Sequence, residues 1–205
     1  MTKLLSIFPD HIQEAKLAEA AAVLERGGIV IYPTDTIYAM GCSIMQPKAL
    51  ERMAKIKDVR LDKAVFSLIV HDFSHITDYT RPMSTAVYKL MKHCLPGPFT
   101  FILEANSSIP KLMNSRRKTL GIRIPNNPVT LGLVEKLGCP IVSTSLHDDD
   151  QIIKFPTDPD EIFAHYQDKV DVVINGGYGN TEESTVVDCT EEEPVIIRQG
   201  KGVIQ

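Results

Sequence analysis

The sequence predicts a mixed α/β fold built on one sheet whose strands run in both directions. Short β-branched runs alternate along the chain with segments in which apolar residues recur at helical spacing. Some connections are long enough for a helix and others only for a hairpin, which favours parallel and antiparallel strands in the same sheet. We find no internal repeat and no linker long enough to divide the chain, so residues 1–205 are expected to form a single domain.

The strand predictions depend on apolar runs that end at proline, glycine or polar residues. The clearest run, Gly28 to Tyr32, has no polar face and stops at Pro33, which cannot donate a ladder hydrogen bond. Further strands are expected at residues 4–7, 65–70, 99–103, 120–124, 140–143, 170–175, 185–188 and 195–198.

The helix predictions depend on amphipathic spacing and on capping residues. Apolar residues between Leu17 and Leu24 recur on one helical face, with Asp10 as the expected N-cap and two glycines at 27–28 as the stop. Pro82 suits a first helical position. The other helices are expected at residues 46–57, 73–78, 82–93 and 127–138, and from residue 157 onward.

Composition excludes several classes of partner and location. The net charge of −4 and the pI near 5.9 argue against bulk electrostatic attraction to nucleic acid or to an anionic membrane. No apolar run reaches the length of a membrane span, and the first residues are too short a stretch for a signal peptide. The 4 cysteines are widely spaced without a C-x-x-C pair, which is typical of reduced thiols in a cytoplasmic protein.

Hydroxyls and cations, instead of apolar residues, occupy several strand ends, where ligands usually bind in open α/β sheets. These residues are Thr34, Thr36, Thr119, Arg123, Ser143, Ser145, Ser184 and Arg198. An arginine inside a strand needs a partner, because an unpaired buried charge is very costly. Two kinds of partner stay open for Arg123 and Arg198: an internal salt bridge to Asp35 or Asp188, or the carboxylate or phosphate of a ligand.

Other catalytic and binding motifs are missing from the sequence. The glycines at 176, 177 and 179 do not form a Walker phosphate loop, and there is no dinucleotide fingerprint and no G-x-S-x-G nucleophile motif. His71 and His75 have i, i+4 spacing but lack the glutamate of H-E-x-x-H, so we predict no metal-ligating residues.

An ordered set of short motifs identifies a family. The motifs are Tyr32-Pro33-Thr34-Asp35-Thr36-Ile37-Tyr38-Ala39-Met40-Gly41, Leu95-Pro96-Gly97-Pro98-Phe99-Thr100, Gly121-Ile122-Arg123-Ile124-Pro125, Ser143-Thr144-Ser145, Ser184-Thr185-Val186-Val187-Asp188 and Arg198-Gln199-Gly200. In this order and spacing, they resemble the YrdC-like family of threonylcarbamoyl-adenylate synthases, and more closely its YciO branch. The resemblance runs from about Ser6 to Gly202.

The resemblance implies the YrdC-like fold, a single twisted open sheet flanked by helices whose concave face binds ligand. Family members condense L-threonine, bicarbonate and ATP into threonylcarbamoyl-AMP and pyrophosphate, with Mg²⁺ expected to accompany ATP. The product feeds the N6-threonylcarbamoyl modification of adenosine in tRNA. This chemistry needs no protein nucleophile, because the protein positions two anions and neutralises charge on the leaving pyrophosphate.

The resemblance also implies roles for individual residues. Thr36, Arg123 and Ser184 would bind L-threonine, with Arg123 holding its carboxylate. The residues facing the nucleotide would be Thr119, Ser143, Ser145, Ser184 and Arg198. Lys57 matches the lysine of a K-x-R motif and would contact phosphate or bicarbonate, and Lys57, Ser145 and Arg123 are the expected catalytic residues.

The chain departs from the family pattern at the same site. Val59 stands in place of the K-x-R arginine, although Arg60 or Lys63 could partly compensate. His147 replaces the asparagine of an S-x-N motif, and Leu68 and Phe155 replace a histidine and a serine. Two hypotheses therefore stay open: a synthase of reduced activity, or a non-catalytic YciO-type relative that holds a nucleotide, or tRNA or double-stranded RNA, in the same groove.

Overall fold

The computed structural model describes residues 1–109, 113, 118–146 and 156–204. The strands are β1 Lys3–Ser6, β2 Val30–Tyr32, β3 Ala39–Ser43, β4 Ser67–Ile69, β5 Phe99–Glu104, β6 Thr119–Arg123, β7 Ile141–Ser145, β8 Val172–Asn175, β9 Thr185–Asp188 and β10 Val195–Arg198. The helices are α1 Glu14–Glu25, α2 Pro47–Ile56, the 3-10 helix η1 Phe73–Asp78, α3 Thr85–Cys94, α5 Pro128–Leu137 and α6 Pro159–Tyr166. None of these helices is both long and apolar enough to cross a membrane.

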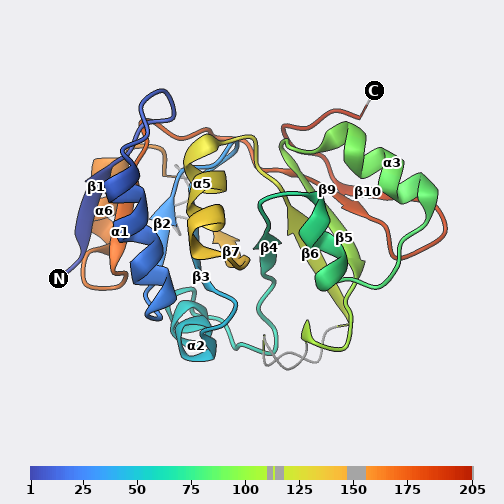
Figure 1. The fold of residues 1–205 in the computed structure, drawn as a ribbon, viewed down its shortest axis with the longest axis horizontal. Coiled ribbons are helices and arrows are strands. Elements are labelled where there is room, and N and C mark those ends of the chain that lie inside the picture. Colours follow the sequence, from blue (N-terminus) through green and yellow to red (C-terminus); the bar gives the residue numbers. More distant parts are fainter. Residues whose placement is uncertain (110–112, 114–117, 147–155, 205) are drawn as a thin grey trace.

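The described strands form one open sheet of 10 strands in the order β1-β8-β2-β3-β7-β4-β6-β5-β9-β10 (Figure 1). Four neighbouring pairs are parallel, namely β1–β8, β2–β8, β4–β6 and β5–β9, and the other pairs are antiparallel. The predicted mixed α/β fold, with a single open sheet of both strand directions flanked by helices, is confirmed.

Three local predictions were wrong. β3 was not predicted as a strand, because its sequence Ala-Met-Gly-Cys-Ser lacks the β-branched and aromatic residues that mark strands. Asp10 is not an N-cap, since α1 begins at Glu14 after Gln13 and residues 8–11 form a small bridge. Pro82 lies before the third helix, whose N-cap is Ser84; the Ser84 hydroxyl accepts a hydrogen bond from the Val87 amide.

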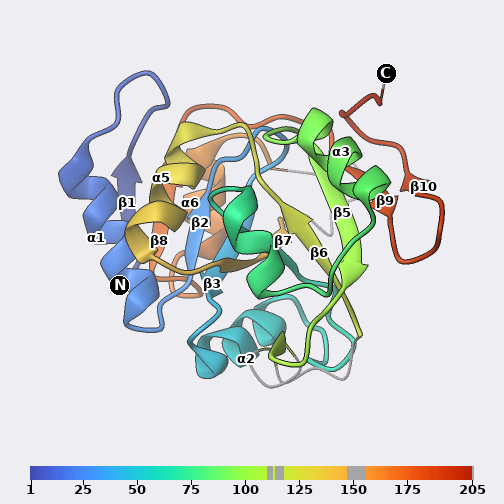
Figure 2. The same cartoon turned by 45° about the vertical axis from the view of Figure 1, so that its right-hand side comes forward.

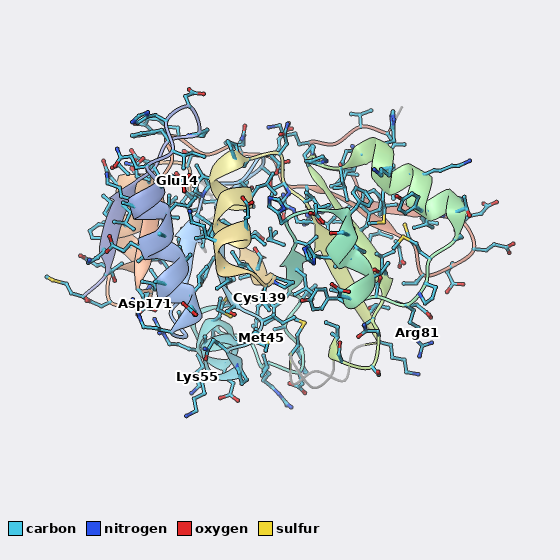
Figure 3. All side chains as sticks on the ribbon, viewed as in Figure 1. Glu14, Met45, Lys55, Arg81, Cys139 and Asp171 are labelled. Atoms are coloured by element: carbon cyan, nitrogen blue, oxygen red, sulfur yellow. The ribbon has the colours of Figure 1, made fainter. Side chains whose placement is uncertain are left out.

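Two layers of helices enclose the sheet. α1 and α5 lie side by side and pack on apolar residues of β1, β2, β7 and β8 (Figures 1 and 2). The larger core contains buried residues of α2, α3, α6 and η1 together with the opposite row of strand side chains. Charged side chains such as Lys55 and Arg81 point outward (Figure 3).

A buried hydrogen bond connects α5 to the end of β2. Thr130 on α5 is fully buried, and its hydroxyl donates to the carbonyl oxygen of Pro33. Pro33 directly precedes the turn of Thr34, Asp35 and Thr36, so this bond connects the helix layer to the polar turn.

We expect Thr130→Val to lower the free energy of unfolding by about 1–3 kcal/mol, because the buried Pro33 carbonyl loses its partner. Urea unfolding followed by circular dichroism measures the change. Thr130→Ser, which keeps the hydroxyl, is the control and should cost less. Equal losses for both variants would contradict a role for the hydrogen bond.

Candidate functional site

A row of small residues crosses four adjacent strands, and the three on β7, β4 and β6 line open space above the sheet. The strand register aligns Gly41 with Ser143, Ser143 with Ser67, and Ser67 with Gly121. The neighbouring row is apolar and packs into the larger core on the opposite face; it consists of Cys42, Val142, Leu68 and Ile122. Because side chains alternate between faces, the sheet is filled on one side and open on the other.

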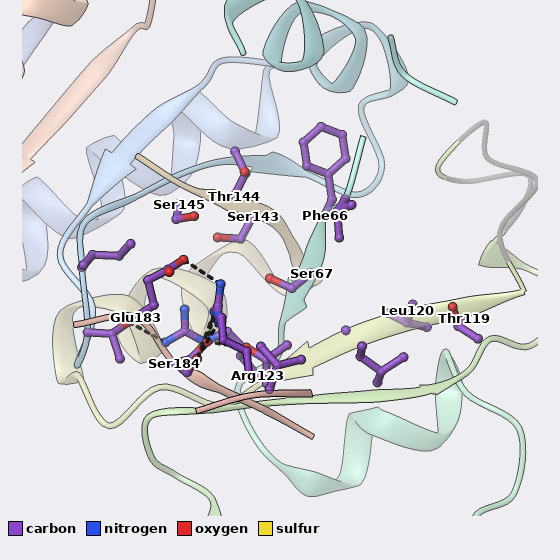
Figure 4. Close-up of a pocket in the computed structure, with 18 residues that line it drawn as sticks. Phe66, Ser67, Thr119, Leu120, Arg123, Ser143, Thr144, Ser145, Glu183 and Ser184 are labelled. Carbon is purple, nitrogen blue, oxygen red and sulfur yellow. Dashed lines mark hydrogen bonds and ion pairs between the residues drawn. The ribbon is translucent and has the colours of Figure 1, made fainter. Parts of the chain in front are cut away.

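A cavity of about 220 Å³ lies over this part of the sheet (Figure 4). Its lining includes every residue predicted for threonine or nucleotide binding: Thr36, Thr119, Arg123, Ser143, Ser145, Ser184 and Arg198. Thr119 and Arg123 lie at opposite ends of β6, roughly 13 Å apart at the usual strand rise. The cavity is therefore elongated along β6.

Arg123 is the most constrained group in the cavity. Its Nη2 donates to Asp35 Oδ1 at 3.1 Å and to Thr36 Oγ1 at 3.0 Å, and both charged side chains are less than 10% exposed. Its Nε is buried and has no hydrogen-bond partner among the described residues. Burial lowers the pKa of the guanidinium, Asp35 opposes this effect, and the positive charge of Arg198 adds to it. An anion bound near both arginines would relieve their mutual repulsion.

Arg198, on β10, is held by the segment just before β9. Its Nη1 donates to Glu183 Oε1 at 2.6 Å, and its Nη2 donates to the Ser184 carbonyl at 2.9 Å and to Ser184 Oγ at 3.3 Å. The acid that pairs with Arg198 is therefore Glu183 and not Asp188, whose carboxylate binds the amide and hydroxyl of Thr190.

The hydroxyls of the cavity are already oriented by the protein. Thr34 donates to the Ile37 carbonyl at 2.7 Å and lies 3.0 Å from Thr36 Oγ1, so Thr36 donates to Thr34 while it accepts from Arg123. Burial raises the pKa of Tyr32, so its phenol stays protonated and donates to Ser143 Oγ at 2.7 Å. Thr36 therefore keeps a lone pair for a ligand N–H, and Ser143 keeps a hydrogen to donate.

Lys57 lies beside the cavity instead of in its lining. Its Nζ donates to the Ser145 carbonyl at 3.2 Å, at the end of β7. In the loop that follows, Val59 is 42% exposed, and the guanidinium of Arg60 binds Asp62 at 2.9 and 3.1 Å. Arg60 therefore does not supply the missing motif arginine in this arrangement. Leu68 is fully buried in the core, and Ser67 is the residue of β4 that lines the cavity.

Several lining residues were not identified from the sequence. Ser67, Thr100 and Glu183 also line the cavity, with Thr100 Oγ1 at 2.8 Å from Ser184 Oγ. A single polar residue next to apolar residues of a predicted strand is the signal that could have found Ser67 and Thr100. His147 and Phe155, two of the predicted departures, lie outside the described residues.

The described cavity offers no cage for a resident divalent cation. No group of three or more histidine, cysteine or acidic side chains in the described residues is arranged to hold a metal ion. Glu183 is the lining carboxylate, and it already binds Arg198. The donor set fits Mg²⁺ only as a part of a bound Mg·ATP substrate, with phosphate oxygens as its ligands.

Comparison with known proteins identifies the family. A family model described as Sua5/yciO/yrdC, telomere recombination, matches residues 22–200. The chain belongs to the Sua5/YciO/YrdC family. The resemblance inferred from the motifs is thereby confirmed.

Both branches of the family are represented among the relatives. An uncharacterized protein of Haemophilus influenzae is 40% identical over 203 residues, which cover 98% of this chain and 97% of that protein. The crystal structure of Escherichia coli YciO has a TM-score of 0.89 and 35% identity, and covers 100% of this chain and 98% of that one.

The other branch contains named enzymes. A threonylcarbamoyl-AMP synthase of Pyrococcus abyssi is 28% identical over 98% of this chain and 58% of its own length. The crystal structure of Pyrococcus abyssi Sua5 complexed with L-threonine has a TM-score of 0.88 and 26% identity, over 97% of this chain and 58% of that one. The family therefore includes threonylcarbamoyl-AMP synthases, and this chain spans just over half the length of these two proteins.

We expect Asp35→Asn to lower the free energy of unfolding by about 3–5 kcal/mol, because it leaves the buried Arg123 charge without its counter-ion. Denaturant unfolding measures the loss. Asp62→Asn removes the acid of the exposed Arg60 pair and should cost about 0–1 kcal/mol. Similar small effects of both substitutions would show that Asp35 does not stabilise Arg123.

Proposed function

We propose that this protein condenses L-threonine, bicarbonate and ATP into threonylcarbamoyl-AMP and pyrophosphate, a product suited to the N6-threonylcarbamoyl modification of tRNA adenosine. The observation that carries the proposal is the buried guanidinium of Arg123, a residue that lines the cavity together with Thr36, Ser184 and Arg198. The similar fold of Pyrococcus abyssi Sua5, solved with L-threonine, supports an amino acid as the ligand.

The acid end of the cavity suits an α-amino acid. The Arg123 guanidinium would donate to the carboxylate, and the remaining lone pair of Thr36 Oγ1 would accept from the nitrogen of threonine. Asp35 keeps the guanidinium in place, so the charge is preorganised before the ligand arrives. Ser184, bonded to both Thr100 and Arg198, lies between this end and the nucleotide.

The nucleotide end uses weaker but more numerous contacts. Ser143 can donate a hydrogen bond, and Ser145 and Thr119 add hydroxyls on the neighbouring strands. Lys57 and Arg198 would stabilise negative charge on the phosphates. ATP would enter as its Mg²⁺ complex, with the metal held by phosphate oxygens.

The reaction then needs positioning and no covalent intermediate with the protein. The threonine nitrogen forms a carbamate with carbon dioxide derived from bicarbonate, and releases a proton. A carbamate oxygen attacks the α-phosphorus of ATP, and the bond to the leaving pyrophosphate breaks. The cavity contributes by holding both anions and by compensating charge on the leaving group.

A second candidate is a relative that binds the nucleotide or the acid without joining them. The observation that favours it is the 58–63 loop, in which Val59 replaces the motif arginine and Arg60 is bound to Asp62. RNA binding gains less support, because the guanidinium of Arg52 is paired with Asp171 at 2.6 Å. Calorimetry with L-threonine and ATP, separately and together, distinguishes the two candidates through cooperative binding and turnover.

We expect Arg123→Lys to lower kcat/KM for L-threonine by about 10- to 100-fold, since a hydrogen bond to a charged group contributes roughly 1.5–3 kcal/mol. Lysine keeps a charge for Asp35 but loses the planar fork. The measurement is threonine- and bicarbonate-dependent pyrophosphate release. Arg81→Lys, which alters an exposed surface pair with Glu104, is the control and should match the wild type. A folded wild-type protein without threonine-dependent release would exclude the synthase.

Val59→Arg tests the altered loop directly. Restoring the motif arginine should raise the rate of pyrophosphate release by about 10²-fold or more if the loop presents it to the phosphates. Val65→Arg, at an exposed valine of the cavity lining, controls for added charge. Pyrophosphate release that appears only in Val59→Arg would favour the second candidate for the natural protein. An unchanged rate of release would show that the valine at position 59 does not limit the rate.

A further inference from the structure

Lys201 connects the two arginine–carboxylate pairs of the cavity. Its backbone amide donates to the carbonyl oxygen of Glu183 at 2.9 Å, and its Nζ donates to the carbonyl oxygen of Asp35 at 2.7 Å. Glu183 is the acid that holds Arg198, and Asp35 is the acid that holds Arg123. One residue therefore touches the backbone of both acids, although residues 35 and 183 belong to different halves of the chain.

The segment that carries Lys201, residues 198–202, is tightly bound to the sheet. The hydroxyl of Thr185 accepts from the Gly200 amide at 2.9 Å and donates to the Gly202 carbonyl at 2.6 Å. The side chain of Gln199 donates to the same carbonyl at 2.7 Å. A Cβ at Gly200 would collide with the Glu183 carbonyl, and one at Gly202 would collide with the ring of Phe99. These glycines allow the close approach that lets Lys201 reach Asp35.

The contact of Lys201 with Asp35 lies at the residue that holds the Arg123 guanidinium. The Asp35 carboxylate binds Arg123 through Oδ1 and accepts from the Asn126 amide through Oδ2 at 2.9 Å. A shift of the Asp35 backbone would move both bonds, and with them the guanidinium and Thr36. The ammonium of Lys201 is exposed, so its hydrogen bond contributes little to global stability. The effect of this hydrogen bond is instead to fix the position of the Asp35 backbone.

We infer that Lys201 is a positioning residue that sets the spacing of the two arginine–carboxylate pairs and thereby couples ligand binding at the Arg123 end to ligand binding at the Arg198 end. The coupling part of this inference rests on the proposed function, because it requires an acid at one end and a nucleotide at the other. Such coupling requires that both ligands favour the same arrangement of a shared element, and Lys201 is the residue bonded to the backbone of both acids.

The first test uses the ligand-free protein and does not depend on the proposed function. Amide hydrogen exchange at Thr36 and Asn126 reports on the Asp35 turn, since both amides are bonded there. In Lys201→Met we expect exchange at these amides to be about five- to tenfold faster, the factor that one ordinary hydrogen bond provides. Lys201→Arg should restore the wild-type rates, and Lys89→Met, at an exposed lysine of α3, should not change them.

The second test measures the coupling itself. Calorimetry gives the Kd of L-threonine without and with an ATP analogue whose α and β phosphorus atoms are joined by a methylene group. The ratio of the two Kd values should fall toward one in Lys201→Met and return in Lys201→Arg, whereas the Kd of the analogue alone stays close to the wild-type value.

The outcomes separate the two proposals. Wild-type protein that binds no threonine contradicts the proposed function, and the exchange rates then decide the role of Lys201 alone. Unchanged exchange at Thr36 and Asn126 in Lys201→Met overturns the positioning role. Faster exchange with an unchanged Kd ratio overturns the coupling and leaves a purely structural contact.

Discussion

The buried ion pair of Arg123 and Asp35 is the constraint on which the site depends. A guanidinium inside a strand is tolerated only with a counter-ion, and Asp35 comes from a turn 88 residues earlier in the chain. The pair therefore ties the turn after β2 to β6 across the sheet. Thr34, Thr36 and Asn126 take their positions from the same two side chains, so the acid end of the cavity is one hydrogen-bonded unit.

The cavity exists because small side chains meet in register. Ser143, Ser67 and Gly121 lie in one row, and a Cβ at Gly121 would come within 3.0 Å of Thr100. Larger residues in this row would fill the space that the ligands need. The apolar row on the opposite face supplies the burial that stabilises the same strands, so the sheet gains its core on one face and its function on the other.

The sequence predicted the polar strand ends well, and their partners less well. Arg123, Ser143 and Thr36 were identified because each interrupts or ends an apolar run, and that signal is local. Asp188, one of the internal acids considered for Arg198, is not its partner, because the Asp188 carboxylate binds Thr190 in its own turn. Arg198 binds Glu183 instead, and this choice depends on the pairing of β9 with β10, which the sequence does not reveal. β3 was missed for the opposite reason, since its small residues carry no strand signal and its place is set by β2 and β7.

The arginines that line the cavity and the loop that carries the altered family motif differ in which of the expected charged groups they retain. In the cavity each arginine charge is offset by a carboxylate, so general attraction for anions is weak and recognition depends on the planar donors that remain. The K-x-R arginine is the altered position in the 58–63 loop, where Val59 takes its place and Arg60 is bound to Asp62. Under the proposed function, binding of the acid would depend on the Arg123–Asp35 pair and the rate of phosphoryl transfer on the 58–63 loop, so the two properties would belong to separate parts of the chain.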